Sequence, residues 1–311
     1  MFIGEPIAPL QAYVPWVFSI ITFIGSLKMD LSSFKKTFSE PKPFILVMLV
    51  LRFIMPIWGL IFGRLLFPND IYIQTGLLLF AVLPVAINSM IWTMLYKGNV
   101  TLSLSTILFD TILSPIIMPL SFLILQGTSV EMDSFGMMRS LLQMIVIPSI
   151  LGIIINHKTK GKFGDKWSPI LSPYTRIGMI ASIIVNGATI RDQFPPFSLH
   201  LLMIMVSISF LSASGYTITM LIAKLFKLQN KEAKTIVFSG GMRNMGTGLV
   251  IAISHFPSQA AIPIITGMML QQIVCSVFAK LMEKQFPIVE EKTKKKMGDD
   301  KLPIQKRLET S

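Results

Sequence analysis

Residues 238–257 read FSGGMRNMGTGLVIAISHFP, and they carry the strongest structural signal in the chain. They lie inside a long apolar segment, yet four glycines flank the pair Arg243 and Asn244. An arginine at the middle of a membrane helix costs about 2.5–3.5 kcal/mol on insertion scales, and unwound backbone is tolerated there only beside protein or a water-filled cavity. The stretch therefore predicts a broken membrane helix that forms part of a polar site. The alternative is a glycine-rich face that packs against another helix, with the arginine side chain extending to the membrane–water interface.

The composition indicates a polytopic membrane protein. Of the 311 residues, 52% are hydrophobic and 14% are charged, whereas soluble domains carry about 25% charged residues. The only cysteine, Cys275, lies in an apolar run, so no internal disulfide is possible. The three histidines are far apart in the sequence, which predicts no metal site. The sequence contains no nucleophile–base arrangement and no phosphate-binding loop, which argues against an enzyme.

Apolar segments of spanning length recur along the chain. They lie at about residues 8–27, 43–63, 75–96, 100–126, 137–156, 173–190, 199–222, 235–254 and 261–282. We therefore expect an all-α polytopic membrane protein with nine transmembrane helices in a membrane domain over residues 1–282. The basic tail, residues 283–311, is expected to be cytoplasmic and disordered, because it is polar and of mixed charge.

Basic residues gather in alternate connections between these segments. Cytoplasmic loops retain Lys and Arg, and 23 of the 28 basic residues fall in the first, third, fifth and seventh connections, counted with the adjoining ends of the segments, and in the tail from Lys280. The other connections hold only Arg64, Arg139 and Arg191. This pattern predicts a cell-membrane protein with its N-terminus outside and its C-terminus inside. It also explains the net charge of +12 by contact with the bilayer rather than with nucleic acid.

The third segment contains a second interruption. Pro84 removes an intrahelical hydrogen bond and is followed by Asn88 and Ser89 at mid-membrane, although a simple proline kink would explain the same residues. Counted from each end, segments one to four match segments six to nine with opposite orientation. Interrupted spans at corresponding positions of inverted halves are typical of the midplane site of a secondary transporter.

Asp110 is the only carboxylate that we place inside a span. It shares a helical face with Asn99, Ser103 and Ile107, at spacings of three and four residues. An intramembrane carboxylate predicts a proton carrier, a cation ligand, or a salt-bridge partner for Arg243 or Arg52. The alternative is a static ion pair that holds two helices together.

Several stretches carry a likeness to one known family. They are SLKMDLSSFKKTFSEPKPF, RFIMP, NSMIWTMLYKGNVTLSLS, TILSPIIMP, GGMRNMGTGLVIAISHF and AAIPIITGMMLQQI. Through them the chain resembles the bile acid:sodium symporter family up to about Leu281. The resemblance implies an inverted repeat with two broken, crossing helices, and a core that moves against a panel in alternating access. The panel would comprise about residues 8–27 and 137–190, and the core about residues 43–126 and 199–282.

The chain departs from the pattern that the resemblance implies for sodium-coupled members. Those members usually carry an acid at the position of Ser239, a glutamine at Arg243, an asparagine at Met90, a threonine at Ile107 and a glutamine at Leu51. Ser89, Ser103 and Asn244 are retained. Hard cations prefer charged oxygen ligands, so the departures predict degraded sodium sites. Arg243 would then replace one bound cation as a tethered charge, balanced by Asp110.

These observations predict a secondary active transporter of a small organic anion, a carboxylate or a sulfonate, that needs no cofactor. The expected substrate site is Asn88, Ser89, Arg243, Asn244 and Thr247, and the expected coupling residues are Asp110, Ser103 and Ser239. Coupling to H⁺, or no coupling, is favoured over coupling to Na⁺. Two alternatives stay open: a sodium-coupled organic anion symporter of the same family, and a non-transporting sensor or receptor with the transporter fold.

Overall fold

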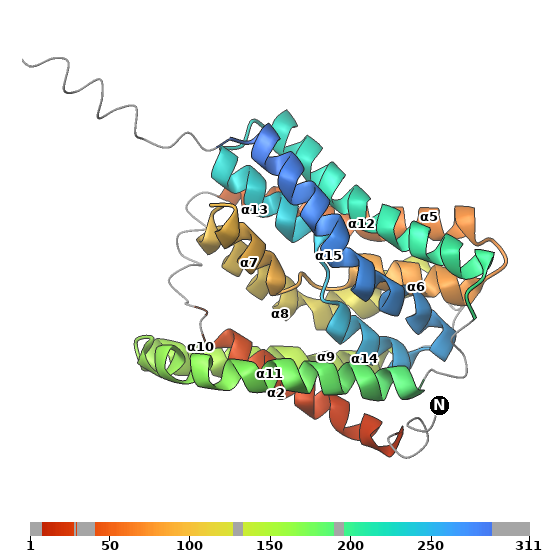
Figure 1. Ribbon diagram of the computed structural model, residues 1–311, viewed down its shortest axis with the longest axis horizontal. Helices are drawn as coiled ribbons and strands as arrows, with labels where there is room; N and C mark the ends of the chain where they lie inside the picture. Colours follow the sequence, from red (N-terminus) through yellow and green to blue (C-terminus); the bar gives the residue numbers. More distant parts are fainter. Residues whose placement is uncertain (1–7, 28, 30–40, 127–132, 190–195, 288–311) are drawn as a thin grey trace, which may run out of the picture.

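The computed structural model is helical throughout the part of the chain that it describes. That part comprises residues 8–27, 29, 41–126, 133–189 and 196–287, and it contains no β-strand beyond one isolated bridge. The expected tail from Ile288 onward, most of the first basic loop and Arg191 lie outside the described residues. Figure 1 shows the helices packed side by side along one common direction.

Six continuous helical segments are long and apolar enough to cross a membrane. They are α4–η2–α5 (Pro41–Leu66), α8 (Val100–Leu125), α9–η3–α10 (Ser134–Lys158), α11 (Lys162–Thr189), α12 (Leu199–Leu225) and η5–α15 (Ser258–Gln285). The chain is therefore a multi-pass helical membrane protein. The count of nine spans stays a prediction, because the other three apolar segments are a short helix and two interrupted ones.

Each interrupted segment consists of two short helices. The first is formed by α6 (Ile71–Val82) and α7 (Asn88–Leu95), and the second by α13 (Asn230–Gly241) and α14 (Met245–His255). Pro84 stops the first helix because it has no N–H to donate. In the second, Gly241 allows a close approach, since a Cβ at this position would collide with the ring of Tyr216. Both interruptions lie where the sequence predicted them.

Two of the long segments contain a π-helical turn, at Val50–Ile54 (η2) and Leu142–Val146 (η3). Each turn is followed by a proline in the first turn of the next helix, Pro56 in α5 and Pro148 in α10. Proline cannot donate to the carbonyl four residues earlier, and a widened turn accommodates that loss. The first of these turns contains Arg52, whose side chain is buried.

The helices form two groups. The short first helix α2 (Val14–Ser26) packs against α10 and α11, whereas α12 packs against α13 and α15, and α5 packs against α6. Figure 1 shows α2, α10 and α11 together on one side of the molecule and α12, α13 and α15 on the other. The first group contains segments expected for the panel, and the second contains segments expected for the core. Helix α14 lies between them and contacts α15 and α6 as well as α2, α9 and α11.

The buried apolar side chains form two clusters, and both interrupted segments pass from one cluster to the other at their breaks. Leu83 belongs to the first cluster and Val85 to the second. In the same way Met245 belongs to the first cluster and Met242 to the second. The unwound residues therefore lie at the boundary between two apolar layers, where polar groups can gather.

Candidate functional site

The two breaks cross and pair with each other through their backbones. Val85 and Arg243 form an antiparallel bridge. Its two hydrogen bonds run from Ala86 N–H to the Met242 carbonyl at 3.2 Å and from Asn244 N–H to the Pro84 carbonyl at 2.8 Å. Exchanging the two segments converts one bond into the other. Each break thus satisfies backbone groups that the other has freed, as non-helical backbone within a membrane requires.

A side chain behind each bridge residue accepts its N–H. Val85 N–H donates to Oδ2 of Asp110 at 2.7 Å, and Arg243 N–H donates to Oε1 of Gln271 at 2.8 Å. Asp110 lies on α8 and Gln271 on α15, which are the helices that follow each interrupted segment. The two acceptors occupy matching places and differ in charge, since one is a carboxylate and the other a neutral amide.

The carboxylate of Asp110 is paired with Arg52. Arg52 Nε lies 2.6 Å from Asp110 Oδ1, and both side chains are buried. The remaining guanidinium nitrogens donate to the carbonyls of Val82 and Asp110 and to Ser114 Oγ. Of the two salt-bridge partners expected for Asp110, the structure shows Arg52; Asp110 acts on the charge of Arg243 without a salt bridge to it among the described residues. Arg52 also lies well inside the protein, a position that the sequence alone leaves ambiguous.

Arg243 is the largest of the fully buried side chains, at 1% exposure. Its three guanidinium nitrogens have no hydrogen-bond partner among the described residues. Burying a charge without a partner is costly, and a guanidinium offers five N–H donors. Asp110 attracts this charge, whereas Arg52, which is paired with Asp110, repels it. The guanidinium thus keeps its N–H donors without an acceptor in the described part of the chain, inside an almost fully enclosed side chain.

The other expected substrate residues lie at the two helix N-termini that begin at the crossing. Asn88 is exposed and Ser89 is buried at the start of α7. Asn244 is the N-cap of α14, and its Oδ1 accepts from Thr247 N–H at 3.3 Å. Helix N-termini carry partial positive charge, so the structure gathers these residues where two such ends meet beside Arg243.

The expected coupling residues other than Asp110 are serines with unsatisfied hydroxyls. The Oγ atoms of Ser103 and Ser239, and also that of Ser89, are buried without a partner in the described part of the chain. They lie on α8, α13 and α7, three helices that pack against one another. Within the described ranges, no three His, Cys, Asp or Glu side chains are grouped as metal ligands would be.

Two residues beside this site were missed by the sequence interpretation. Gln271 could have been noticed as a polar residue in an apolar span. Phe18 had no such signal: a Cβ added to Gly246 would lie 2.8 Å from Phe18 Cε1, so the ring rests on the first turn of α14. Farther along α2, a Cβ on Gly25 would lie 3.3 Å from Ile87 Cδ1. Helix α2 therefore crosses both helix N-termini.

The two half-helices that leave the crossing differ in exposure. Residues 245–252 of α14 are all buried, because this helix packs against α2, α9 and α11. In α7, by contrast, Ile91 is 57% exposed and Leu95 is 69% exposed. A hydrogen bond of 2.8 Å between Ser140 Oγ and His255 Nε2 further ties α9 to the far end of α14. Helix α14 is buried over residues 245–252, whereas α7 is buried on the side that carries Ser89 and Thr93 and exposed at Ile91 and Leu95.

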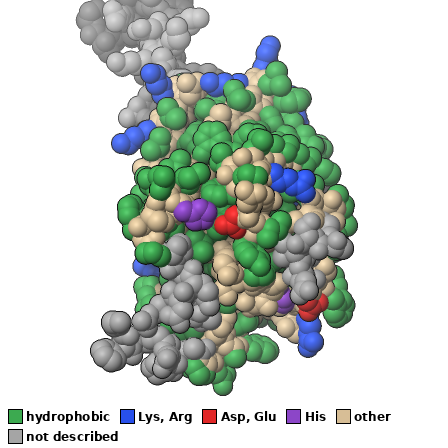
Figure 2. Space-filling view, turned by 90° about the vertical axis from the view of Figure 1, so that its right-hand side faces the viewer, with side chains coloured by type: hydrophobic (Ala, Val, Ile, Leu, Met, Phe, Trp, Pro, Cys, Tyr) green, Lys and Arg blue, Asp and Glu red, His purple; other side chains and the backbone are tan. Residues whose placement is uncertain are grey.

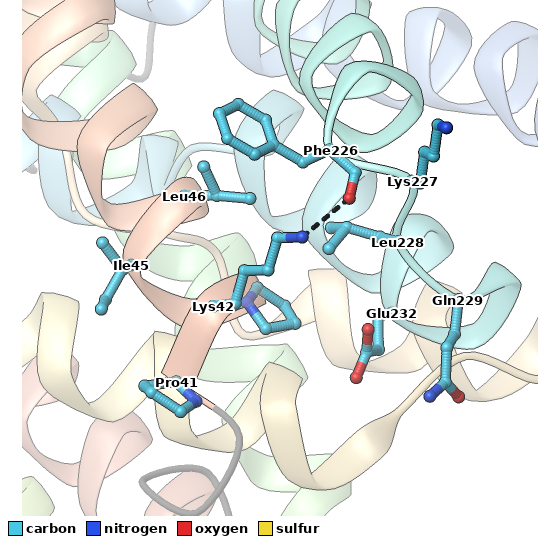
Figure 3. Close-up of a pocket in the computed structure, with 10 residues that line it drawn as sticks. Pro41, Lys42, Ile45, Leu46, Phe226, Lys227, Leu228, Gln229 and Glu232 are labelled. Carbon is cyan, nitrogen blue, oxygen red and sulfur yellow. Dashed lines mark hydrogen bonds between the residues drawn. The ribbon is translucent and has the colours of Figure 1, made fainter.

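A surface groove lies away from the crossing. It measures about 610 Å³ between the start of α4 and the connection from α12 to α13. Figure 3 shows Lys42 reaching across this groove to the Phe226 carbonyl, with an Nζ–O distance of 2.9 Å. Two smaller grooves, of about 550 and 470 Å³, are likewise lined by none of the expected site residues. The candidate site therefore rests on buried polar groups rather than on a preformed surface groove.

Comparison with known proteins gives one matching family and several relatives. The family model described as the sodium bile acid symporter family matches residues 15–195. The uncharacterized protein YbaS of Bacillus subtilis is 41% identical over 271 residues, which is 87% of this chain and 89% of that protein. The uncharacterized sodium-dependent transporter YocS of the same organism is 26% identical, over 82% and 78% of the two chains. The probable sodium/metabolite cotransporter BASS1, chloroplastic, of Arabidopsis thaliana is 26% identical, over 86% and 66%.

Proposed function

The chain belongs to the sodium bile acid symporter family, whose members are membrane transporters and not enzymes, and on this premise we propose that it carries a small organic anion by alternating access. The substrate class is a carboxylate or a sulfonate. The panel comprises about residues 8–27 and 137–190, and the core comprises about residues 43–126 and 199–282. The two halves of the chain are inverted repeats, as the matching hydrogen bonds at Val85 and Arg243 support.

The observation that carries the proposal is the buried, unpartnered guanidinium of Arg243 at the crossing of two broken helices. Carboxylates and sulfonates accept two parallel N–H bonds from a guanidinium. Asn88, Ser89, Asn244 and Thr247 add hydrogen-bonding groups at two helix N-termini, which also favour negative charge. A cation or a neutral solute would leave the buried charge uncompensated, so an anion is the ligand that this site stabilises most.

The exposure of the half-helices supports a conformation open to the cytoplasm. With the N-terminus outside and the protein in the cell membrane, α14 runs from the crossing to the outer surface and α7 runs to the inner surface. The outer half-helix packs against α2, α9 and α11, whereas the inner one is exposed on one side and packs against α8 and α13 on the other. Figure 2 looks onto the end of the molecule where α5 and α6 meet, the outer end in this orientation; its charged side chains are scattered among hydrophobic ones.

We favour transport that is coupled to protons or uncoupled. Asp110 is the candidate proton carrier, but both of its oxygens are engaged, by Arg52 and by Val85 N–H. A carrier role therefore requires that this ion pair open during the cycle, and without such opening the pair is structural. Sodium-coupled symport is the second candidate. It is favoured by the free hydroxyls of Ser89, Ser103 and Ser239, and the names of two relatives include sodium.

A binding screen followed by transport measurements tests the proposal. The purified full chain is heated with small carboxylates and sulfonates in sodium buffer and in matched choline buffer, because a ligand that binds the folded state raises the melting temperature. We expect stabilisation by at least one anion in both buffers. The best anion is then followed into proteoliposomes, where uptake should not rise steeply with sodium. No stabilisation by any anion contradicts the anion function, and steep sodium dependence selects the second candidate.

A further inference from the structure

Two side chains accept the backbone N–H groups of the bridge residues, and they differ in charge. Asp110 Oδ2 accepts from Val85 N–H at 2.7 Å, and Gln271 Oε1 accepts from Arg243 N–H at 2.8 Å. The negative charge of Asp110 is paired with Arg52, whose Nε lies 2.6 Å from the other carboxylate oxygen. On the Gln271 side the acceptor is neutral, and the guanidinium of Arg243 finds no partner among the described residues.

From this difference we propose that Gln271 is a specificity-determining residue, which holds the backbone of Arg243 in place while leaving its positive charge to the substrate. The inference deepens the proposed function and rests on it. A carboxylate at this position would make the same hydrogen bond and would also compensate the guanidinium, as Asp110 does for Arg52. The Gln271 amide thus holds a backbone N–H without compensating a charge, whereas Asp110 does both.

Because residue 271 is buried, the charge of its side chain has a strong effect on its neighbours. Gln271 is 6% exposed and Arg243 is 1% exposed, so charges placed there interact with little screening by water. Arg52 is paired with Asp110, and Gln271 Oε1 lies 2.8 Å from the backbone nitrogen of Arg243, so a negative charge introduced at residue 271 would lie within reach of the Arg243 side chain. The predicted consequence of Q271E is an ion pair inside the protein that competes with the transported anion.

The neighbouring residue offers a matched control. Gln272 is exposed, and its side chain accepts a hydrogen bond from Trp92 Nε1 at 3.3 Å. Successive residues of a helix point about 100° apart, so Q272E adds the same charge at nearly the same depth on another face of α15. A second variant, Q271L, removes the acceptor without adding charge. The three variants separate the effect of charge at residue 271 from the loss of a hydrogen bond.

The experiment measures anion binding to the purified full chain by calorimetry and by melting temperature. The probes are acetate, pyruvate, benzoate and methanesulfonate at constant ionic strength. We expect Q272E to bind the best probe as the unmodified chain does, and Q271E to bind it about tenfold more weakly or worse. The melting temperature of Q271E should be maintained or raised, because a buried charge gains a partner. Q271L should melt at a lower temperature and still bind the probe better than Q271E.

Each outcome leads to a distinct conclusion. Equal affinity in Q271E and the unmodified chain overturns the role of Gln271 and leaves the anion function standing. A Q271E chain that does not fold also overturns it, because the proposal requires Arg243 to accept the new carboxylate as counter-ion. The double variant R243Q/Q271E checks that pairing, since it should melt below Q271E. An unmodified chain that binds none of the four probes counts against the proposed function, and with it against this inference.

Discussion

Val85 and Arg243 hold equivalent positions in the two broken segments and face each other across the bridge, yet one carries an isopropyl group and the other a buried guanidinium. The backbone around them is nearly symmetric, since each donates its N–H to the helix that follows its segment. The charge around them is not symmetric, because the acceptor behind Val85 is the carboxylate of Asp110 and the acceptor behind Arg243 is the neutral amide of Gln271. An approximate two-fold scaffold thus supports a single cationic site.

Replacing Arg243 by glutamine should weaken anion binding and stabilise the fold. The variant removes the charged donor, and it also removes a buried charge without a partner, whose cost is about 1–3 kcal/mol or more. Binding of the best carboxylate or sulfonate and the melting temperature are measured together. Arg243→Lys is the matched variant, because it retains the charge without the fork of donors. Unchanged affinity in R243Q would favour the packing explanation of this stretch.

Breaking the pair of Arg52 and Asp110 should be strongly destabilising. Asp110→Asn leaves a buried guanidinium without its counter-ion, a loss of about 3–5 kcal/mol for such pairs. The double variant R52Q/D110N should lose less than the two single variants added together, because each single change strands the other partner. Thermal unfolding in one detergent checks this. Additive losses would show that the pair contributes little.

The same substitution tests whether Asp110 carries protons. If the carboxylate takes up a proton during transport, D110N should remove the pH dependence of uptake in proteoliposomes, because the amide does not titrate. Uptake is compared across a pH series with and without an imposed pH gradient. Pro115→Ala on the same helix serves as a variant that disturbs α8 without changing charge. A pH dependence that survives in D110N rules out the carrier role.

Adding a methyl group at Gly246 should impair transport through Phe18. The new Cβ would lie 2.8 Å from Phe18 Cε1 and 3.0 Å from its Cζ, so α2 would be pushed away from the first turn of α14. G246A should reduce uptake severalfold, and F18A/G246A should recover part of it. Gly187→Ala on α11 is the control, because a Cβ there meets nothing within 4 Å. Equal uptake by G246A and G187A would show that this contact is dispensable.

Labelling of introduced cysteines should distinguish the two half-helices. The natural Cys275 is fully buried, so C275A provides a background without reactive thiols. In inside-out vesicles, a membrane-impermeant maleimide should label L95C on α7 quickly and L249C on α14 slowly, since Leu95 is 69% exposed and Leu249 is 2% exposed. Alternating access predicts that a transported anion changes the ratio of the two rates. Equal rates, unaffected by any anion, would contradict the conformation proposed above.

The amino-acid sequence by itself determined the class of fold, the long apolar helices and the places where two of them break. These properties depend on local chemistry. A run of about 20 apolar residues is long enough to cross the bilayer, Pro84 lacks an N–H donor, and Arg243 beside glycines is costly in an unbroken membrane helix. The family is shown by the model matched over residues 15–195, which includes Pro84, and by a relative that is 41% identical over 271 residues.

Only the tertiary structure decided which charges pair. Arg52 and Asp110 are 58 residues apart, and Arg243 and Gln271 are 28 apart; Phe18 meets Gly246 from the other end of the chain. The sequence left Arg243 and Arg52 both open as salt-bridge partners of Asp110, because all three carry charge inside a span, and partners within a membrane are set by which helix faces meet. Packing brought Arg52 to the carboxylate and left Arg243 with a neutral amide, and that arrangement gives the crossing its positive charge.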